Sequence, residues 1–359
     1  MLVAFHRLEV AQIRPETPEA VSVVFAVPQE LSQAYRFDPG QHLTLRTMLR
    51  GIETRRSYSI CAGLDDGELR IAVKKVEDGA FSRWLSESVK PGDWIDVMTP
   101  QGRFGLRPDP GAARTYLAIA AGSGITPIIS IVRSVLERER KSRVVLLYGN
   151  RTTQSIIFKE ALEDLKDRFL DRFSLLHVLS RERQEVALLD GRIDSDKIAM
   201  VLHMLAPADR IDQAFVCGPA GLIEQSRASL LGAGVPAARI HVEHFTIDGL
   251  PRSARERGRA KTDSQEPAAT VHVRLNGIEH RVALSPGESV LEAGLRQGLD
   301  LPFSCRGGMC CTCRAMLTDG RVEMDQNYSL EPWELQAGYV LTCQAHPVTQ
   351  TLSVDYDQI

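Results

Sequence analysis

Four of the seven cysteines in this 359-residue chain stand near its C-terminal end in a pattern that few folds can accommodate. Cys305, Cys310 and Cys313 are followed thirty residues later by Cys343, which gives the order C-x4-C-x2-C…C. This is a spacing by which four thiolates hold a 2Fe-2S cluster. Three of the ligands must come from one sharply bent loop, and Gly307-Gly308 can supply the backbone freedom that such a bend needs. The pattern therefore predicts a 2Fe-2S site with these four cysteines as its ligands.

A zinc site and a disulfide pair are the alternatives for these cysteines. Zinc sites usually present two C-x2-C pairs, whereas this stretch offers one such pair and a lone distant cysteine. A 2Fe-2S cluster accepts one electron at a time at roughly -400 mV, so another part of the protein should supply electrons. Cys311, which directly follows Cys310, is expected to be a bystander because the other four already complete the set.

Composition and charge limit the possible locations and partners of the protein. The chain is 43% hydrophobic and 25% charged, which is ordinary for two or three globular domains. Its most apolar stretch, residues 116–132, is interrupted by glycine and proline, so neither a signal peptide nor a membrane span is expected. Free thiolates favour a reducing compartment, which predicts a cytoplasmic protein. Residues 269–359 carry six Arg against eleven Asp plus Glu, and this acidic balance predicts no nucleic-acid partner.

The first third of the chain, residues 1–108, reads as short alternating runs separated by turn residues. The runs are Val21–Pro28, His42–Met48, Leu69–Val76 and Trp94–Met98. This rhythm predicts an antiparallel β-barrel domain.

Two stretches of that predicted barrel carry groups that suit a flavin. Arg56-Ser57-Tyr58-Ser59 places a guanidinium, an aromatic ring and hydroxyl groups on one extended segment. These groups can bind a pyrophosphate, cover the isoalloxazine ring and reach its edge. Gly79 and Ser82 begin an amphipathic helix whose free N–H groups suit a phosphate. An ordinary half-exposed strand is the alternative for the Arg-x-Tyr-Ser segment.

The middle third, residues 109–246, alternates buried strands with helical segments, which predicts a parallel-sheet α/β nucleotide-binding domain. The predicted strands are Tyr116–Ala121, Val144–Tyr148, Phe173–Leu179 and Ala214–Cys217, and helical periodicity covers Ser155–Phe169. Gly122-Ser-Gly124-Ile-Thr126-Pro127 follows the first strand. Its glycines let the backbone approach a pyrophosphate, and Thr126 is expected to cap the following helix. The third glycine of G-x-G-x-x-G is absent.

Arginines at two strand ends bear on the choice of nucleotide. Arg151 follows the second predicted strand, and Ser180-Arg181 follows the third. Ligands of open α/β sheets bind at these ends, and an adenosine 2′-phosphate requires arginine, whereas a bare ribose pairs with an acid. The pattern therefore favours NADPH, with ordinary surface arginines as the alternative.

The last 113 residues read as a tether followed by a small domain. Residues 247–268 are polar, mixed in charge and without apolar periodicity, which predicts a solvated linker. Beyond them, Asn276-Gly277 predicts a tight hairpin, and Ser289 with Glu292 predicts a capping box at the start of a helix. With the cysteine loop and a closing strand at Thr349–Tyr356, residues 269–359 match a β-grasp fold of the plant-type ferredoxin kind.

The first two thirds resemble the ferredoxin-NADP reductase superfamily, in which Arg-x-Tyr-Ser followed by Gly-x-x-Ser is the flavin signature. The resemblance implies FAD rather than FMN. It implies flavin contacts at Arg56, Ser57, Tyr58, Ser59, Gly79 and Ser82, with Val73 and Lys74 as weaker candidates.

The same resemblance covers the nucleotide-binding domain, because Gly-x-Gly-x-Thr-Pro is the form of the loop found in this superfamily. It implies nucleotide contacts at Gly122, Gly124, Thr126, Arg151, Ser180 and Arg181, and at the turn Cys217-Gly218-Pro219 beside the nicotinamide. Glu243 and Phe245 are implied near the flavin, with Ser59, Cys217 and Glu243 as the catalytic group. A small buried strand-end residue is the alternative for Cys217, and a structural strand end is the alternative for Glu243 and Phe245.

Taken in order, the three domains resemble the reductase components of multicomponent oxygenases. Cys305–Cys313, Glu323–Tyr328 and Gly338–Ala345 are similar to reductase subunits of phenylacetyl-CoA epoxidases. The resemblance implies electron flow from NADPH through FAD and the cluster to separate di-iron oxygenase subunits. The alternatives are a reductase of another oxygenase, such as a ketosteroid hydroxylase or an acyl desaturase, a non-catalytic iron-sulfur redox sensor, and a structural subunit.

Overall fold

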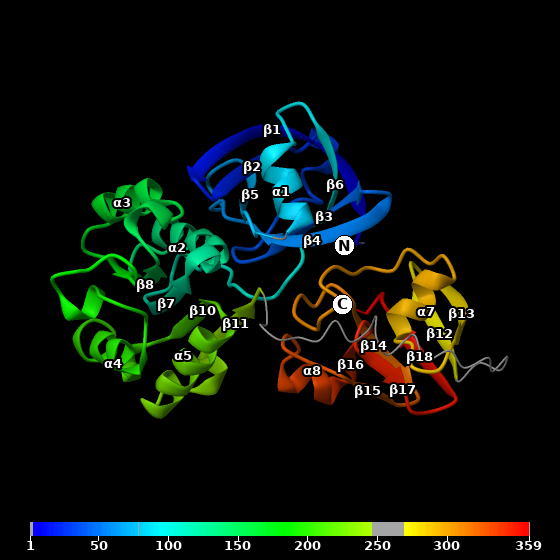
Figure 1. Cartoon of the computed structure of the whole chain (residues 1–359). Coiled ribbons are helices and arrows are strands. Elements are labelled where there is room, and N and C mark those ends of the chain that lie inside the picture. The colour runs from blue at the N-terminus through cyan, green and yellow to red at the C-terminus, as the bar shows by residue number, and fades with distance from the viewer. Residues whose placement is uncertain (1–2, 78, 246–268, 359) are drawn as a thin grey trace. The chain divides into compact units, whose positions relative to one another are not determined.

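The computed structural model describes residues 3–77, 79–245 and 269–358, which belong to two compact units (Figure 1). One unit spans Phe5–Thr246, and the other contains the described C-terminal residues. The linker expected at residues 247–268 lies outside the described residues. No helix in the described ranges is long and apolar enough to cross a membrane.

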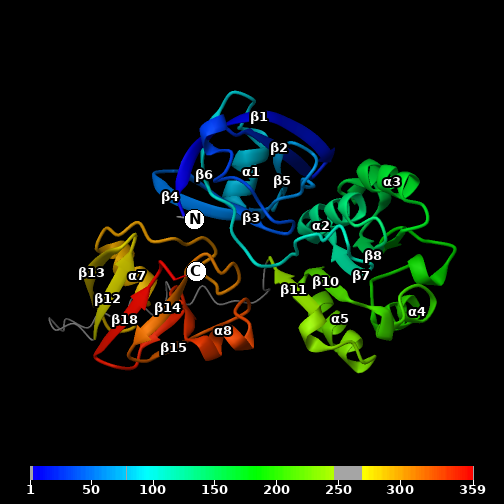
Figure 2. The same cartoon turned by 180° about the vertical axis from the view of Figure 1, so that it is seen from behind.

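The first sheet of the larger unit is the predicted antiparallel barrel (Figure 2). Its strand order is β4-β3-β6-β1-β2-β5, and a bridge between Ile60 and Ile71 connects the two ends of that order. The strands are β1 (Phe5–Thr17), β2 (Ala20–Ala26), β3 (His42–Leu49), β4 (Ile52–Ser59), β5 (Leu69–Lys74) and β6 (Trp94–Met98), and helix α1 covers Ala80–Glu87. The predicted runs omit β1, because only Leu8 and Val10 of its thirteen residues are buried and no clear alternation marks it.

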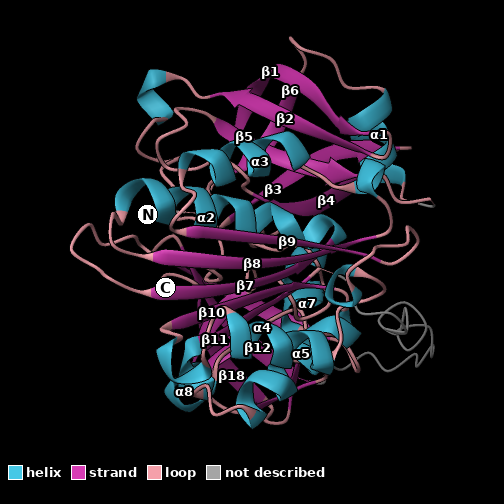
Figure 3. Ribbon diagram, turned by 90° about the vertical axis from the view of Figure 1, so that its left-hand side faces the viewer, coloured by secondary structure: helices cyan, strands magenta, loops and turns pink. Residues whose placement is uncertain are grey.

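The second sheet of this unit is the predicted parallel sheet, with strand order β11-β10-β7-β8-β9 (Figure 3). Its strands are β7 (Thr115–Ala121), β8 (Arg143–Asn150), β9 (Phe173–Leu179), β10 (Gln213–Gly218) and β11 (Ile240–His244). The helices are α2 (Ile125–Arg138), α3 (Lys159–Arg168), α4 (Ser195–Met204) and α5 (Ala220–Gly232). Tyr116 and Ala118 of β7 face a core that includes α2 and α3, whereas Leu117 and Ile119 face a core that includes α4 and α5. Burial on both faces explains the continuous apolar runs of these strands.

Two local expectations for this domain are wrong. The helix predicted over Ser155–Phe169 begins only at Lys159, because buried Phe158 has a φ of +62° and interrupts the helical backbone. Thr126 does not cap α2: Gly124 occupies the N-cap, and the Thr126 hydroxyl donates to the Ser123 carbonyl at 3.0 Å.

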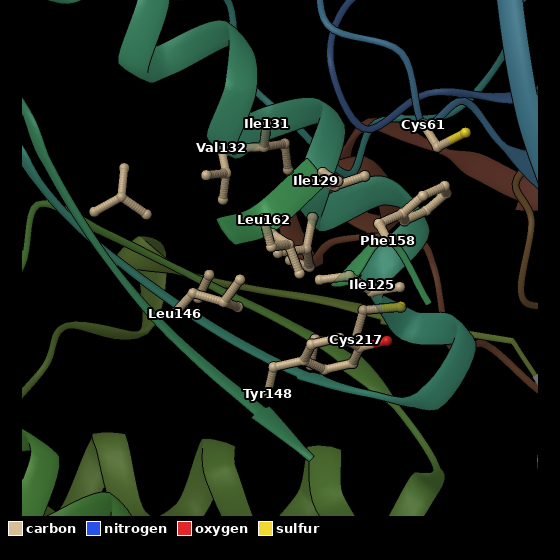
Figure 4. Packing of buried hydrophobic residues seen from close by; sticks show 14 of the residues in the cluster. Cys61, Ile125, Ile129, Ile131, Val132, Leu146, Tyr148, Phe158, Leu162 and Cys217 are labelled. Atoms are coloured by element: carbon tan, nitrogen blue, oxygen red, sulfur yellow. The ribbon is translucent and has the colours of Figure 1, made fainter. Parts of the chain in front are cut away.

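Helix α2 connects the barrel to the parallel sheet. The Ser130 hydroxyl donates to the Ala62 carbonyl at 2.6 Å, and the Arg133 guanidinium pairs with Asp66 at 2.7 Å. Cys61, from the end of the barrel, lies in the same buried cluster as residues of α2, β8 and α3 (Figure 4). One buried cluster therefore contains residues of both the barrel and the parallel sheet, while the interior of the barrel forms a separate core.

The C-terminal unit has the expected β-grasp arrangement. Its sheet has the order β13-β12-β18-β14-β16, in which β12 and β18 are parallel and the other neighbours antiparallel. The elements are β12 (Ala269–Leu275), β13 (Ile278–Leu284), α7 (Val290–Arg296), β14 (Arg314–Asp319), β15 (Val322–Met324), α8 (Pro332–Ala337), β16 (Tyr339–Leu341), β17 (Ala345–Pro347) and β18 (Thr351–Asp355). Asn276 and Gly277 both have positive φ, which confirms the tight hairpin, and Ser289 with Glu292 forms the predicted capping box.

A buried carboxylate at the end of α2 offers a test of this fold. Glu139 is 0% exposed and accepts hydrogen bonds from the Tyr116 hydroxyl, the Ser142 hydroxyl and the Asp109 amide. Glu139→Ala would remove the acceptor of the buried Tyr116 and Ser142 hydroxyls, so we expect a loss of roughly 3 kcal/mol in the free energy of unfolding, seen as a lower thermal midpoint. Glu137→Ala, which removes only a surface ion pair with Arg168, should cost less than about 1 kcal/mol. Equal midpoints for the two variants would contradict this assignment.

Candidate functional site

The two adjacent arginines of β4 differ in their exposure to solvent. Arg55 is 5% exposed, and its guanidinium lies 5.0 Å from the ring of Phe5. Arg56 is exposed, and its Nη1 donates to the Arg55 carbonyl at 2.7 Å. Arg56 is therefore the residue of this pair that can present a guanidinium to a pyrophosphate.

The other polar residues of β4 have mixed surroundings. The Ser57 hydroxyl lies 3.1 Å from that of Thr44. Tyr58 is partly exposed, and its ring packs at 6.0 Å from that of Phe81 on α1. Burial raises the pKa of Tyr58, so its hydroxyl remains a neutral donor. Tyr58 thus offers an aromatic surface at the start of α1.

The turn before α1 is built around Gly79 and Ser82. The Ser82 hydroxyl accepts from the Val76 amide at 3.2 Å and donates to the Gly79 carbonyl at 3.1 Å. A Cβ on Gly79 would lie 2.5 Å from that hydroxyl oxygen, so the tight turn favours glycine. Helix α1 has no side-chain cap, which leaves its first N–H groups available to an anion. Ser82 therefore stabilises the turn before α1 through its two hydrogen bonds to the backbone.

The two weaker flavin candidates lie on β5. The Val73 side chain is 0% exposed in the barrel core, so only its backbone can contact a ligand. Lys74 is partly exposed, and its ammonium group lies 3.4 Å from a Glu19 carboxylate oxygen.

Two loops meet at the carboxyl end of the parallel sheet. A Cβ on Gly124 would lie 2.1 Å from the Cys217 carbonyl oxygen, so the loop after β7 can approach the end of β10 only without a side chain there. The Tyr148 hydroxyl donates to the Gly122 carbonyl at 3.0 Å and fixes the other end of the loop. Gly218 and Pro219 continue from Cys217 into the start of α5. The Gly-x-Gly and Cys-Gly-Pro segments are thus in direct backbone contact.

Ser59, Cys217 and Glu243 are brought together from three different strands. The Ser59 hydroxyl of the barrel donates to Glu243 Oε2 at 3.4 Å, and Glu243 pairs with Cys217 in the register of β11 and β10. Burial raises the pKa of Glu243 from 4.5 to about 8, against the lowering effect of the Ser59 hydroxyl. Burial also raises the pKa of the fully enclosed Cys217 thiol. At neutral pH the Glu243 carboxyl and the Cys217 thiol are therefore protonated and uncharged.

Phe245 follows this group at the end of β11. It is partly buried, and it packs against the core shared by the barrel and the parallel sheet.

The predicted 2′-phosphate residues lie together at the ends of β8 and β9. The Ser180 and Arg181 amides donate to the Asn150 and Arg151 carbonyls at 3.0 and 2.8 Å, which joins the two strand ends. Both Arg151 and Arg181 are exposed, and their side chains make no ion pair within the ranges that the structure describes. Neighbouring Glu182 accepts from the Thr153 amide and hydroxyl at 2.7 and 2.6 Å. Two arginines are therefore available here, while the adjacent acid is engaged.

The cysteine loop bends at positions that the sequence only partly predicts. Gly308 has a φ of +75°, and a Cβ there would lie 2.9 Å from the Gln326 carbonyl oxygen. Gly307 does not share this conformation, whereas Arg306 and Cys311 both adopt a φ of +53°. The bend therefore relies on one glycine and two non-glycine residues, rather than on the glycine pair.

The four predicted ligands lie as two pairs. The Cys310 thiol donates to the Cys305 sulfur. This hydrogen bond, together with those from the Gly307 and Met309 amides at 3.3 and 3.4 Å, lowers the pKa of Cys305. The Cys313 thiol donates a hydrogen bond to the Cys343 sulfur, and both cysteines are free. No group of three or more His, Cys, Asp or Glu side chains in the described residues is placed to hold a metal ion. Two pairs of thiols fit a cluster with two iron centres, each of which needs two cysteines.

Some residues beside the cysteines have roles that sequence reasoning does not identify. The Cys311 thiol donates to the Ser329 carbonyl at 3.3 Å, and its role as a bystander stays a prediction. Gln344, which is absent from the predicted set, reaches both the cysteine loop and the Cys343 sulfur. Its position directly after Cys343 is the one signal in the sequence that points to it.

Three stretches of the chain match known domain families. Residues 8–105 match the oxidoreductase FAD-binding domain, residues 118–228 the oxidoreductase NAD-binding domain, and residues 273–348 the 2Fe-2S iron-sulfur cluster binding domain. This combination defines an iron-sulfur flavoprotein oxidoreductase of the ferredoxin-NADP reductase superfamily, and it confirms the predicted domain types.

Full-length relatives narrow that class. The chain is 45% identical, over 99% of both chains, to a subunit of the 1,2-phenylacetyl-CoA epoxidase of Escherichia coli (strain K12). It is 34% identical to the ferredoxin reductase component of 3-ketosteroid-9-alpha-monooxygenase of Rhodococcus rhodochrous, over 97% of this chain and 96% of that relative. A glycine betaine monooxygenase reductase subunit of Pseudomonas aeruginosa (strain UCBPP-PA14) is 29% identical, with 98% and 95% covered. The chain belongs to this family of reductase components of multicomponent oxygenases.

Solved structures share the architecture. Phthalate dioxygenase reductase is 22% identical, with a TM-score of 0.59 and 98% of both chains covered. An intact type IV self-sufficient cytochrome P450 monooxygenase is 20% identical, with a TM-score of 0.69 over 98% of this chain, which spans 41% of that longer chain. At these identities the likeness establishes the fold.

The raised pKa of Glu243 predicts a pH-dependent effect on stability. Since the folded state holds this proton up to about pH 8, against an ordinary value of 4.5, the stability that protonated Glu243 contributes below pH 4.5 declines as the pH rises through 8. Glu243→Gln removes that decline, so its thermal midpoint should improve relative to the wild type between about pH 5 and about pH 9.

The measurement is a series of thermal scans across that range. Exposed Glu185→Gln, in the loop after β9, serves as the control. A difference between wild type and Glu243→Gln that stays constant with pH would show that Glu243 is ionised throughout.

Proposed function

We propose that this protein is the NADPH-dependent reductase of a di-iron oxygenase of the phenylacetyl-CoA epoxidase type. The observation that carries the proposal is the 45% identity to the 1,2-phenylacetyl-CoA epoxidase relative across 99% of both chains. We assign residues 1–108 to the FAD domain, 109–246 to the NADP domain, 247–268 to a linker and 269–359 to the ferredoxin-type domain. The proposed cluster needs reduced cysteines as ligands. Because thiols stay reduced in the cytosol, this requirement supports a cytoplasmic location.

The flavin site is assigned to β4 and the start of α1. Arg56 would neutralise the pyrophosphate, Tyr58 would cover the ring system, and Ser59 would reach its edge. The uncapped first turn of α1 after Gly79 would add backbone donors, with Ser82 holding the turn. Ser57, Val73, Lys74 and Phe245 complete the proposed contacts. When bound, FAD supplies the conversion between two-electron and one-electron chemistry.

The nucleotide site is assigned to the carboxyl end of the parallel sheet. Gly122, Gly124 and Thr126 would receive the pyrophosphate, and Cys217, Gly218 and Pro219 would lie beside the nicotinamide. The glycine loop supports this assignment because an added Cβ at Gly124 would collide with the Cys217 backbone. Ser180, Arg151 and Arg181 would hold the 2′-phosphate.

Ser59, Cys217 and Glu243 form the proposed catalytic group. The Ser59 hydroxyl and the Glu243 carboxyl form a hydrogen-bonded pair at the junction of barrel and sheet. With the pKa of Glu243 at about 8, the pair would hold a proton on the Glu243 carboxyl at neutral pH and could supply it to a bound cofactor.

The cluster is assigned to Cys305, Cys310, Cys313 and Cys343. The two thiol pairs and the amides aimed at Cys305 support this choice of ligands. A one-electron carrier in the last domain suits delivery to a separate oxygenase.

A reductase for another oxygenase is the second candidate. The 34% identity to a ketosteroid monooxygenase reductase over 97% of this chain supports it.

Reconstitution tests the proposed partner. The protein, NADPH and the di-iron subunits of the phenylacetyl-CoA epoxidase should together consume phenylacetyl-CoA. Added salt should slow electron transfer to those subunits, because residues 269–359 carry a net charge of -5 and salt screens their attraction to a basic partner surface. NADPH-driven flavin reduction within the chain should change little over the same salt series. Full activity with ketosteroid oxygenase subunits and none with the epoxidase subunits would favour the second candidate.

Nucleotide choice is tested at the strand ends. Arg181→Ala should raise KM for NADPH by about tenfold and leave kcat nearly unchanged, because it removes uniform binding of the 2′-phosphate. Values for NADH should not change. Arg140→Ala is the matched control, since that exposed arginine lies between α2 and the start of β8, at the opposite end of the sheet. Equal kcat/KM for both nucleotides in the wild type would refute the assignment.

A further inference from the structure

Gln344 is a buried amide beside the proposed cluster ligands. Gln344 is only 9% exposed and directly follows Cys343 in the sequence. Its Nε2 atom lies 2.9 Å from the Arg306 carbonyl oxygen, 3.0 Å from the Cys343 carbonyl oxygen and 3.6 Å from the Cys343 sulfur. The amide nitrogen is thus surrounded by acceptors.

The surroundings settle the orientation of this amide. Two of its three neighbours are backbone carbonyls, which only accept hydrogen bonds, so the nitrogen and not the oxygen must face them. Two N–H groups serve three acceptors, so one N–H is shared. A deprotonated sulfur attracts that shared hydrogen more strongly than a neutral one, because hydrogen bonds to charged acceptors are stronger.

The same side chain joins the two segments that provide the ligands. Arg306 belongs to the loop with Cys305, whereas Gln344 belongs to the segment with Cys343. Asp325 N–H donates to the Gln344 carbonyl at 3.1 Å, so the backbone of Gln344 is held as well. The side-chain amide therefore cannot turn away from the sulfur without breaking its bonds to the Arg306 and Cys343 carbonyls.

We propose that Gln344 sets the reduction potential of the cluster by donating a hydrogen bond from its side-chain amide to the Cys343 sulfur. Hydrogen bonds to the cluster sulfurs are one of the factors that fix the potentials of iron-sulfur centres. A donor stabilises the state with the additional negative charge more than the other state, so it raises the potential. The inference rests on the proposed assignment of the four cysteines as cluster ligands.

The test is a potentiometric titration of the purified holoprotein, followed by EPR of the cluster. Gln344→Leu removes the donor and should change the equilibrium between the two oxidation states by about three- to tenfold, which lowers the midpoint by ~28 to 59 mV. Gln344→Glu keeps the size of the side chain but adds negative charge, and it should lower the midpoint further.

Gln297→Leu is the matched control. Gln297 also donates its amide to a backbone carbonyl, that of Ala283 at 2.8 Å, but it lies at the end of α7 and bonds to no sulfur. Its midpoint should equal that of the wild type.

The outcomes separate this inference from the proposed function. A wild-type protein without two irons per chain would contradict the ligand assignment itself. A complete cluster whose midpoint is unchanged in both Gln344 variants would overturn this inference alone. Loss of the cluster in both variants would also overturn it, because Gln344 would then build the loop rather than tune the potential.

Discussion

The packing of α2 against both the barrel and the parallel sheet is the constraint on which the rest of the larger unit depends. Ser130 and Arg133 bond to the barrel segment Ala62–Asp66, while the apolar side of α2 lies in the core that includes β7 and β8. Because that cluster contains residues of both the barrel and the parallel sheet, Ser59 of the barrel can lie within hydrogen-bonding distance of Glu243 of the sheet. Residues of both sheets thereby meet in the proposed catalytic group.

The C-terminal unit meets a different constraint. Its four proposed ligands must lie close together although they come from a loop and a distant segment. The backbone N–H and C=O groups of that loop therefore cannot form the regular hydrogen bonds of a helix or sheet. The structure satisfies them locally: amides point to the Cys305 sulfur, and Gln344 and Ser329 side chains bind carbonyls of the loop. Unpaired buried polar groups would otherwise destabilise the loop.

The sequence predicts those features that depend on local chemistry. The Asn276-Gly277 hairpin, the Ser289 capping box and the buried parallel strands all follow from short patterns, and each is confirmed. The failures arise where tertiary packing overrides a local preference. Burial of Phe158 stabilises a backbone conformation that no helical pattern reveals.

The candidate site also has features that the sequence predicts and features that it does not. The cysteine spacing and the glycine loop are local, so they are visible in the sequence. The Gln344 contact, the engagement of Glu182 by Thr153 and the burial of Arg55 rather than Arg56 depend on how segments meet in space. Alternation along β4 distinguishes two faces but cannot say which arginine is enclosed.

Anaerobic titration with NADPH shows whether this one chain passes electrons from a nucleotide to a one-electron carrier. Visible absorbance reports the flavin and EPR reports the cluster, in the wild type and in Cys343→Ser. We expect one FAD and two irons per wild-type chain, and a 2Fe-2S EPR signal on addition of NADPH. In the variant that signal should be lost while the flavin absorbance still bleaches. Zinc or four irons in the wild type, or an unchanged signal in the variant, would contradict this expectation.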